Sequence, residues 1–284
     1  MTRETRHNVH MDLPLSTLLT PRLLWMHEVG STNAELVQHL SGADSASWPH
    51  LSVIASDNQT RGKGRLGRDW SAPAGASLAI SVAIRPATPS GRPLQPEALG
   101  WLGLLAGLAM ARACTAVLPA GVSAKVKWPN DVLIGQRKVC GVLSELVMTA
   151  QGPAVVVGAG VNLALVEDQL PVPTATSLKL EGAEDHTVDA ILAAYLTEFS
   201  RIVGVFLAAE GDAVSSGLRD DVQQACDTVG RSVRVEMPSG EHLIGTATRI
   251  TESGAIEVNL SDGMTTVEVA AGDVTHLRVI MNGG

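Results

Sequence analysis

Residues 55–70 read ASDNQTRGKGRLGRDW, a stretch in which glycines alternate with basic side chains. The chain as a whole is acidic, with a formal net charge of −8 over 284 residues, so positive charge gathered on flexible backbone requires an explanation. We consider three: a dinucleotide-binding fingerprint, a nucleic-acid patch, and a loop that closes over a small anion. The residues concerned are the glycines Gly62, Gly64 and Gly67 and the cations Arg61, Lys63, Arg65 and Arg68.

The segment GKGRLG, residues 62–67, matches the pattern G-x-G-x-x-G of dinucleotide-binding proteins. That fingerprint directly follows a strand, opens a helix, and is followed about twenty residues later by a carboxylate that binds the ribose. Here the next predicted element, residues 77–85 (SLAISVAIR), is a strand, and no carboxylate occurs between Asp69 and Glu97. We therefore reject a Rossmann-type site.

The remaining interpretations differ in the extent of the basic surface. Nucleic-acid binding normally requires a broad basic footprint with aromatic side chains, whereas this chain is acidic and has only Trp70 beside the loop. A merely solvated loop would explain the charge but not the glycines, which allow backbone to approach a ligand closely. A loop that orders around a phosphate and a carboxylate explains both features.

The composition describes a globular chain of about two domains. Hydrophobic residues make up 45% and charged residues 18% of it, which is enough apolar material for a core. The cysteines, Cys114, Cys140 and Cys226, form no CxxC motif and no HExxH motif occurs, so we expect a reducing compartment without disulfides or structural zinc. The N-terminus lacks the apolar segment of a signal peptide, and the most apolar run, residues 98–111, is too short to span a bilayer. We expect a cytoplasmic protein with no membrane partner.

Hydrophobic periodicity predicts mixed strands and helices in the first part of the chain. A helix is expected at residues 31–40, where Thr32 and Glu35 form a T-x-x-E capping box, and the run at residues 98–111 is expected to be a buried helix. Residues 124–148 contain two apolar segments joined at Gly135 and Gln136, the pattern of a hairpin. Further strands are predicted at residues 23–29, 51–56, 77–85 and 154–163, and further helices at 187–209 and 212–226.

The pattern changes after Thr228. Short alternating strands are separated there by turn signals, which indicates a small all-β barrel. These signals are PSG, SG and DG at residues 238–240, 253–254 and 262–263. We expect a loose tail over residues 1–22, a main domain over 23–226 and the small barrel over 227–284.

Three further segments indicate ligand contact. KWPND, residues 127–131, combines a cation, an aromatic ring, a proline-set turn and two oxygen-bearing side chains. RKVCG, residues 137–141, places Lys138 before a glycine against which a ligand could lie. GAGVN, residues 158–162, ends a strand with glycines and an amide. Each of them alone is equally compatible with an ordinary turn, strand or bulge.

Taken together and in this order, the segments STN, QTRGKGRLGRDW, KWPND, RKVCGVLSE and GAGVN closely resemble those of the bacterial biotin protein ligases. The resemblance runs from Ser31 to Asn162, and the β-rich tail is similar to the family's small SH3-like domain. It implies an α+β fold, in which a mixed β-sheet with packed helices forms the catalytic domain and the SH3-like barrel follows it. Some members also carry an N-terminal DNA-binding domain; only about twenty residues precede the first predicted strand here, so we expect the enzyme-only form, with no DNA partner.

The resemblance implies a reaction in two steps. Biotin and ATP, with Mg²⁺, form biotinyl-5′-AMP and diphosphate, and biotin is then transferred to one lysine of a biotin carboxyl carrier domain. Two anions must approach each other in the first step, which requires positioned cations rather than a protein nucleophile. Lys138 and Arg65 are the catalytic candidates that the resemblance implies.

The other site residues follow from the same resemblance. The biotin-binding set would be Ser31, Thr32, Asn33, Gln59, Gly62, Lys63, Gly64, Arg65, Lys138 and Gly141. The ATP- or adenylate-binding set would be Arg65, Arg68, Trp70, Asn130, Lys138 and Asn162, with Asp131 as a weak candidate metal ligand. Simpler roles remain open: a helix cap for residues 31–33, core packing for Trp70, a surface position for Lys138 and a turn role for residues 130–131.

Two positions depart from the family pattern. Lys63 stands where arginine is common, which keeps the charge but loses bidentate geometry, and Cys140 stands where a small residue is usual. Two other functions also stay open: a lipoate ligase or transferase of the same fold, and a biotin-sensing protein without transfer activity. The sequence leaves the oligomeric state between a monomer and a weak homodimer.

Overall fold

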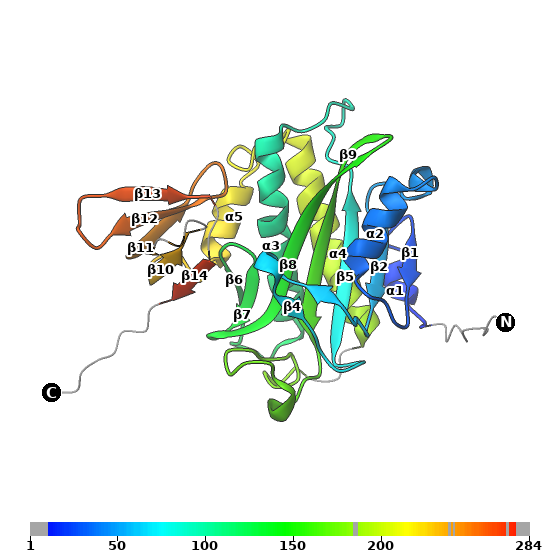
Figure 1. Cartoon of the computed structure of the whole chain (residues 1–284), viewed down its shortest axis with the longest axis horizontal. Coiled ribbons are helices and arrows are strands. Elements are labelled where there is room, and N and C mark those ends of the chain that lie inside the picture. Colours follow the sequence, from blue (N-terminus) through cyan, green and yellow to red (C-terminus); the bar gives the residue numbers. More distant parts are fainter. Residues whose placement is uncertain (1–10, 184–186, 238–239, 241, 271–272, 277–284) are drawn as a thin grey trace.

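The computed structural model describes residues 11–183, 187–237, 240, 242–270 and 273–276. Its larger part is built on a seven-stranded mixed sheet with the strand order β1-β2-β5-β9-β8-β7-β6 (Figure 1). In this sheet β1 and β2 pair in parallel and every other neighbouring pair is antiparallel. The strands are β1 (Leu23–Trp25), β2 (Val53–Ser56), β5 (Ser77–Ile84), β6 (Ala124–Lys127), β7 (Asp131–Ile134), β8 (Arg137–Thr149) and β9 (Gly152–Asn162).

Helices cover the two faces of this sheet unequally. The long helices α3 (Trp101–Val117) and α4 (Val188–Ala208) pack against one face, where the main hydrophobic core lies (Figure 1). The short helix α2 (Thr32–Ser41) covers part of the other face through Leu36 and Leu40. A helix of 10 residues is only about 15 Å long, so much of that second face is left for other elements.

The C-terminal part is a five-stranded antiparallel sheet in the order β13-β12-β11-β10-β14. Its strands alternate as predicted, and in β10 the side chains of Val233 and Val235 are buried while their neighbours are exposed. The α+β class predicted from the sequence is therefore confirmed. The strands are β10 (Ser232–Glu236), β11 (His242–Ile250), β12 (Ile256–Leu260), β13 (Thr266–Val269) and β14 (Asp273–His276).

The remaining elements are short. A two-stranded hairpin formed by β3 (Gly62–Lys63) and β4 (Asp69–Trp70) encloses the 3-10 turn η2 (Arg65–Gly67), and it contains the glycine-rich basic stretch. The hairpin predicted around Gly135 and Gln136 is confirmed, because β7 and β8 pair across these two residues. The other short elements are α1 (Pro14–Thr17), α5 (Leu218–Ala225), and the 3-10 helices η1 (Ser45–Ser47), η3 (Pro96–Gly100) and η4 (Glu167–Gln169).

The start of α2 differs from the prediction by one residue. The N-cap is Ser31, whose Oγ accepts a hydrogen bond from the backbone N–H of Ala34 at 3.4 Å. Thr32 is therefore inside the first turn and its hydroxyl is directed to Gln59, 3.2 Å away. The capping box expected from Thr32 and Glu35 is wrong, because the threonine hydroxyl has a tertiary partner.

The helix predicted over residues 212–226 is also shorter than expected. It begins at Leu218, after Gly217 with φ of 76°. Residues 212–217 form turns instead, in which Asp212 Oδ1 accepts hydrogen bonds from the backbone N–H groups of Val214 and Ser215 at 2.8 and 3.1 Å. An aspartate that bonds its own following backbone competes with helix formation, and periodicity alone does not reveal this.

Residues 13–17 correct the expectation of a loose tail over residues 1–22, of which residues 1–10 lie outside the described part. Helix α1 is bound to α4 through the buried carboxylate of Asp189. This carboxylate accepts hydrogen bonds from the backbone N–H groups of Leu15 and Ser16, both at 2.9 Å, and from Ser16 Oγ at 2.6 Å. The tertiary bonds stabilise a helix that is too short to form alone.

Two helices, residues 96–117 and 188–208, are long and apolar enough to cross a membrane by length and composition. The first of these spans joins η3 to α3 and is longer than the apolar run at residues 98–111, whose prediction as part of a buried helix is confirmed. The two helices pack against each other and share the main core with the sheet, and 67% and 44% of their apolar windows are buried inside the protein. Their composition is accounted for by the core.

Asp189→Ala should lower the free energy of unfolding by about 1–3 kcal/mol, because it leaves the buried backbone N–H and hydroxyl of Ser16 without this acceptor. Urea unfolding followed by circular dichroism measures this. Asp168→Ala, on the exposed η4, is the matched control and should change stability by less than about 0.5 kcal/mol. Equal effects of both changes would show that Asp189 does not hold α1.

Candidate active site

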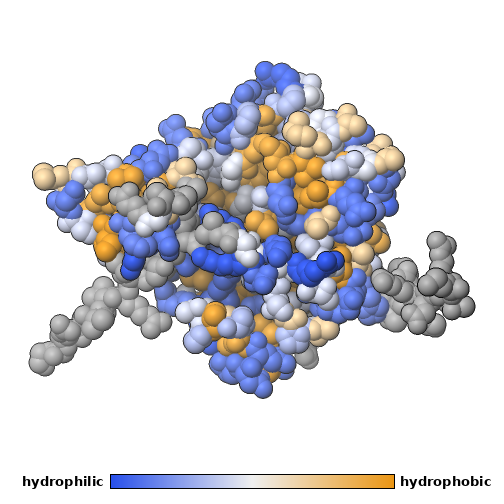
Figure 2. Space-filling view, viewed as in Figure 1, coloured by the Kyte–Doolittle hydropathy of each residue, from blue (hydrophilic) through white to orange (hydrophobic). Residues whose placement is uncertain are grey.

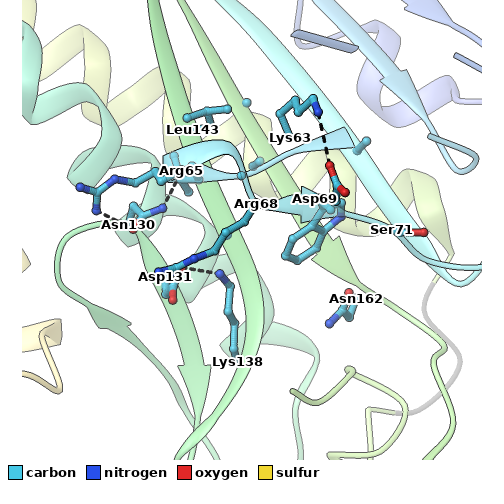
Figure 3. A pocket seen from close by; sticks show the side chains of 18 of the residues that line it. Lys63, Arg65, Arg68, Asp69, Ser71, Asn130, Asp131, Lys138, Leu143 and Asn162 are labelled. Atoms are coloured by element: carbon cyan, nitrogen blue, oxygen red, sulfur yellow. Dashed lines mark hydrogen bonds and ion pairs between the residues drawn. The ribbon is translucent and has the colours of Figure 1, made fainter. Parts of the chain in front are cut away.

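A pocket of about 560 Å³ lies on the face of the seven-stranded sheet that α2 leaves open (Figure 3). Strands β5, β8 and β9 form its floor, the β3–β4 hairpin lies over it, and the β6–β7 turn closes one side. Figure 2 shows strongly hydrophilic side chains across the middle of this face of the molecule, where the β4 hairpin lies in Figure 1. The basic stretch therefore covers a cavity, as the anion-closing interpretation expects.

The floor is deep because the side chains that point toward it are small. Toward the end of β9, Val157, Ala159 and Val161 alternate with Gly158 and Gly160. Since neighbouring residues of a strand face opposite sides, the first three enter the core and the glycines face the pocket. A Cβ atom added to Gly160 would lie 2.6 Å from Trp70 Cε2, and one added to Gly158 would overlap Asn33 Oδ1. Glycine is thus required at both positions, because the side chains of Trp70 and Asn33 lie directly against the backbone there.

One end of the pocket carries uncharged hydrogen-bonding groups. Gln59 Oε1 accepts from the backbone N–H of Thr32 at 2.9 Å and from its hydroxyl at 3.2 Å. Ser81 Oγ, fully buried on β5, lies 2.8 Å from Thr32 Oγ1 and 2.6 Å from Asn33 Oδ1, so its one proton can be donated to either. These bonds fix the orientation of Thr32 and Gln59 before any ligand enters.

Asn33 is held from the opposite side as well. Its Nδ2 donates to Glu145 Oε1 at 2.7 Å and to the backbone carbonyl of Leu143 at 3.2 Å. With Ser81 beside its oxygen, the amide has partners at both ends and is 7% exposed. Asn33 therefore forms a rigid, neutral wall of the pocket.

The other end is cationic. Lys138 Nζ forms an ion pair of 2.6 Å with Asp131 Oδ1, and Arg65 Nη1 donates to Asn130 Oδ1 at 3.3 Å. Figure 3 shows Arg65, Arg68 and Lys138 directed into the same part of the pocket, around Asn130 and Asp131. Basic side chains outnumber carboxylates along the lining of the pocket, which favours anionic ligands. The basic residues are Lys63, Arg65, Arg68, Lys127 and Lys138, and the acidic ones are Asp69, Asp131 and Glu236.

Trp70 lies between the two ends, against the floor. Its ring is in contact distance of the positions above Gly160 and Gly141, and Lys138 Nζ is 5.6 Å from the ring centroid. Among the described residues its buried Nε1 has no hydrogen-bond partner. The ring is half-buried, so it packs on the floor and still presents a surface to the cavity.

The structure brings nearly all predicted site residues to this one pocket. Gly62 is the exception: it is buried beneath Gln59 and the Trp70 carbonyl, where a side chain would overlap both, so its role is to let the hairpin pass. Asn162 lies at the margin, where its Nδ2 donates to the Thr176 carbonyl at 2.9 Å and holds the neighbouring segment. The pocket-lining members are Ser31, Thr32, Asn33, Gln59, Lys63, Gly64, Arg65, Arg68, Trp70, Asn130, Asp131, Lys138, Gly141 and Asn162.

Comparison with known proteins agrees with this geometry. Residues 29–162 match the model of the biotin/lipoate A/B protein ligase family. The chain is 36% identical over 256 residues to the biotin–[acetyl-CoA-carboxylase] ligase of Mycobacterium tuberculosis, covering 88% of this chain and 87% of that protein.

The chain belongs to the biotin/lipoate A/B protein ligase family.

Two further ligases are similar to this chain. It is 38% identical over 164 residues to the biotin–[acetyl-CoA-carboxylase] ligase of Paracoccus denitrificans, covering 56% of this chain and 62% of that one. Its fold is similar to that of the Aquifex aeolicus biotin protein ligase in complex with biotin and ATP, with a TM-score of 0.71 and 24% identity over 91% of this chain and 99% of that one. The fold predicted from the sequence is confirmed by these matches.

Several residues that line or support the ligase pocket were not predicted from the sequence. Ser81 on β5 and Glu145 on β8, the two strands that flank β9, orient Asn33, and Glu236 reaches the pocket from β10 of the C-terminal sheet. Pro171 and Val172 line it from a loop. None of these positions belongs to a local sequence motif. The one available signal was Ser81, a polar residue inside the apolar strand at residues 77–84, which could have indicated a side chain that faces a site.

The two departures from the family pattern have different consequences. Cys140 is fully buried on the core side of β8, and burial raises the pKa of its thiol well above the ordinary value, so it is an inert core residue. Lys63 is at the pocket mouth, 60% exposed, with its Nζ 3.3 Å from Asp69 Oδ1. Only Lys63 is placed where it can meet a ligand of this ligase.

Gly160→Ala should displace the Trp70 indole from the pocket floor, because the added Cβ would lie 2.6 Å from the ring. Acrylamide quenching of tryptophan fluorescence should increase, and the increase should vanish in a Gly160→Ala/Trp70→Phe double variant. Gly204→Ala on α4 is the control, since no atom lies within 4 Å of its added Cβ; it should leave quenching unchanged and stabilise the helix by about 0.5–1 kcal/mol. Unchanged quenching in Gly160→Ala would exclude the packing described for Trp70.

Proposed function

We propose that this chain is a biotin protein ligase, which activates biotin with ATP and transfers it to a lysine of a biotin carboxyl carrier domain. The observation that carries the proposal is the polarity of one pocket. Its neutral end, with Thr32, Asn33 and Gln59, suits an uncharged ureido ring, and its cationic end, with Arg65 and Lys138, suits a carboxylate beside a phosphate. Biotin carries an uncharged ureido ring at one end and a carboxylate at the other.

The first step joins two anions. A carboxylate oxygen of biotin would attack the α-phosphorus of ATP, the bond to the bridging oxygen would break, and diphosphate would leave with the electron pair. Lys138 would contact both the carboxylate and the α-phosphate, and the position of its Nζ in the pocket, 2.6 Å from Asp131 Oδ1 and 5.6 Å from the Trp70 ring centroid, supports this role. Arg65 and Arg68 would offset the charge of the phosphates, which is the main contribution a protein can make to this chemistry.

The hydrogen-bond partners suggest how these cations are held ready. Asp131 pairs with Lys138 at 2.6 Å and Asn130 accepts from Arg65 at 3.3 Å, and ligand oxygens would take the place of these two acceptors. Asn130 is itself fixed, since its Nδ2 donates to the Val142 carbonyl at 2.7 Å. Positioned charges of this kind need little reorganisation during the reaction.

ATP would enter with Mg²⁺, which neutralises phosphate charge and is usually bound by phosphates, waters and one or two carboxylates. The described residues contain no group of three or more His, Cys, Asp or Glu side chains able to hold an ion. Asp131 is suited by donor type to supply a single carboxylate oxygen. The ligand phosphates would therefore provide most of the coordination.

In the second step the acceptor lysine amine would attack the carbonyl of the mixed anhydride, forming an amide and releasing AMP. The hairpin that covers the pocket would exclude water from this reactive intermediate until the carrier arrives. We infer the cytoplasm as the compartment, a carrier domain as the protein partner, and a monomer or weak homodimer as the assembly.

Lys138→Ala should lower the rate of biotin-dependent diphosphate exchange with ATP by at least about 100-fold, since removing one charge-stabilising donor has effects of this size. Lys125→Ala is the matched control, because Lys125 is exposed on β6 of the same sheet and does not line the pocket. Near-normal exchange in a folded Lys138→Ala protein would remove this residue from the reaction.

The same assay separates the other candidate functions. Exchange with lipoate in place of biotin would identify a lipoate ligase. Biotin binding without exchange, and without labelling of a carrier domain, would identify a sensor instead.

Trypsin should cut the free protein within the β3–β4 hairpin, at Arg61, Lys63, Arg65 or Arg68, and biotin with ATP should suppress this cutting. The hairpin has two residue pairs, which is marginally stable alone, and its cations repel one another until anions lie between them. Cleavage at the exposed Lys179, outside the pocket, provides the control. Equal hairpin cleavage with and without both ligands would show that it does not close over them.

A further inference from the structure

Trp128, in the centre of the KWPND segment, is not explained by ligand contact. It borders the pocket, but its side chain is only 1% exposed. Its indole N–H donates to the backbone carbonyl of Gly254 at 3.0 Å, and its backbone N–H donates to Thr228 Oγ1 at 3.1 Å. Both donors of this residue are therefore committed to the C-terminal part of the chain.

The chain leading to the C-terminal sheet runs alongside the same strand. β6 is an edge strand of the seven-stranded sheet, and Val126 forms a parallel bridge with Cys226. The backbone N–H of Asp227 donates to the Val126 carbonyl at 2.7 Å, and Thr228 is fully buried. Residues 226–228 thus extend the pairing of the catalytic sheet up to the residue before Pro129.

The turn that receives the Trp128 indole is itself rigid. Gly254 donates its backbone N–H to the Thr251 carbonyl at 3.1 Å, and Glu268 Oε1 accepts from Thr251 Oγ1 at 2.8 Å and Ser253 Oγ at 2.6 Å. A second indole is bound to this turn, since Trp101 Nε1 donates to the Glu252 carbonyl at 3.0 Å. Two tryptophans of the larger domain are therefore bound to neighbouring carbonyls of one turn.

Only one of these two indoles is coupled to the pocket. Lys127 pairs with Asp131 in the β6–β7 hairpin, so residues 128–130 form its turn, and any shift of Trp128 moves Asn130 and Asp131. Trp101 is on α3, in the core behind the sheet, and does not line the pocket. Trp101 and Trp128 each donate an indole hydrogen bond to the same turn, but only Trp128 is continuous with a turn that lines the pocket.

We propose that Trp128 is a positioning residue, through which the C-terminal sheet holds Asn130 and Asp131 in place at the phosphate end of the pocket. The kinetic consequence rests on the proposed ligase function. Loss of the indole hydrogen bond loosens the turn that orients Arg65 and Lys138, and it leaves the Thr32, Asn33 and Gln59 end unchanged. The effect is therefore larger for ATP than for biotin, which the unchanged end also binds.

The test compares Trp128→Phe with Trp101→Phe, since each removes one indole donor and keeps an aromatic ring. Trp128→Phe should raise the KM for ATP about five- to tenfold, the effect of one net hydrogen bond, and change the KM for biotin less than about twofold. Trp101→Phe should lower the melting temperature similarly and leave both KM values within about twofold. A rise in the KM for ATP of equal size in both variants, or an equal rise for biotin, would overturn the proposal.

A second pair of variants acts on the other bond of Trp128. Thr228→Val removes the acceptor Oγ1 and should raise the KM for ATP, whereas Thr228→Ser keeps an oxygen and should restore it. This pair tests the proposal even if Trp128→Phe does not fold, and unchanged ATP kinetics in Thr228→Val would then overturn it.

Hydrogen exchange separates this proposal from the proposed function. The Val142 amide donates to the Asn130 carbonyl at 2.8 Å, so it should exchange faster in Trp128→Phe than in Trp101→Phe, with no substrate present. An unchanged Val142 rate would overturn the positioning role. Absence of diphosphate release from the natural chain would instead overturn the ligase function.

Discussion

The site depends on a steric constraint in three adjacent strands, β5, β9 and β8. In β5 and toward the end of β9, apolar core side chains on one face alternate with small residues on the other, and β8 adds Gly141, so one face packs against α3 and α4 while the other forms a depression. Gly158 and Gly160 are the extreme case, because a methyl group at either would meet Asn33 or Trp70. The same alternation therefore produces the core and the cavity.

The electrostatics of the pocket follow from what covers that depression. The pocket of this acidic chain takes cations from the β3–β4 hairpin and from Lys138, and Lys63 is paired with Asp69 and Lys138 with Asp131. A pocket with fixed neutral hydrogen-bonding groups at one end and positioned cations at the other can bind an amphiphilic acid and a nucleotide together. Such a site lowers the barrier between two anions without a protein nucleophile. The three cysteines of the chain are buried, and burial raises the pKa of Cys114 to about 12, so they are unsuited to nucleophilic catalysis.

Much of the fold and site could be predicted from the sequence where the signal is local. The strand at residues 77–84, the hairpin at Gly135 and Gln136, and the change to short strands after Thr228 follow from patterns of a few residues. The errors arose where a side-chain hydrogen bond, distant or local, overrides the hydrophobic pattern. Thr32 bonds Gln59 rather than capping α2, Asp189 orders the segment at residues 13–17, and Asp212 binds its own turn in place of a helix.

The sequence by itself determined which chemical groups are available: glycines where close approach is needed, cations beside them, and amides at strand and helix ends. Only the tertiary structure decided which of these groups share a cavity and which serve the framework. Ser81, Glu145 and Glu236 come from three separate strands, and Trp128 is bound by residues 228 and 254, about 100 and 126 positions further along the chain. The physical reason is that a hydrogen bond depends on distance and direction in space, and strand register brings such groups together irrespective of their separation in sequence.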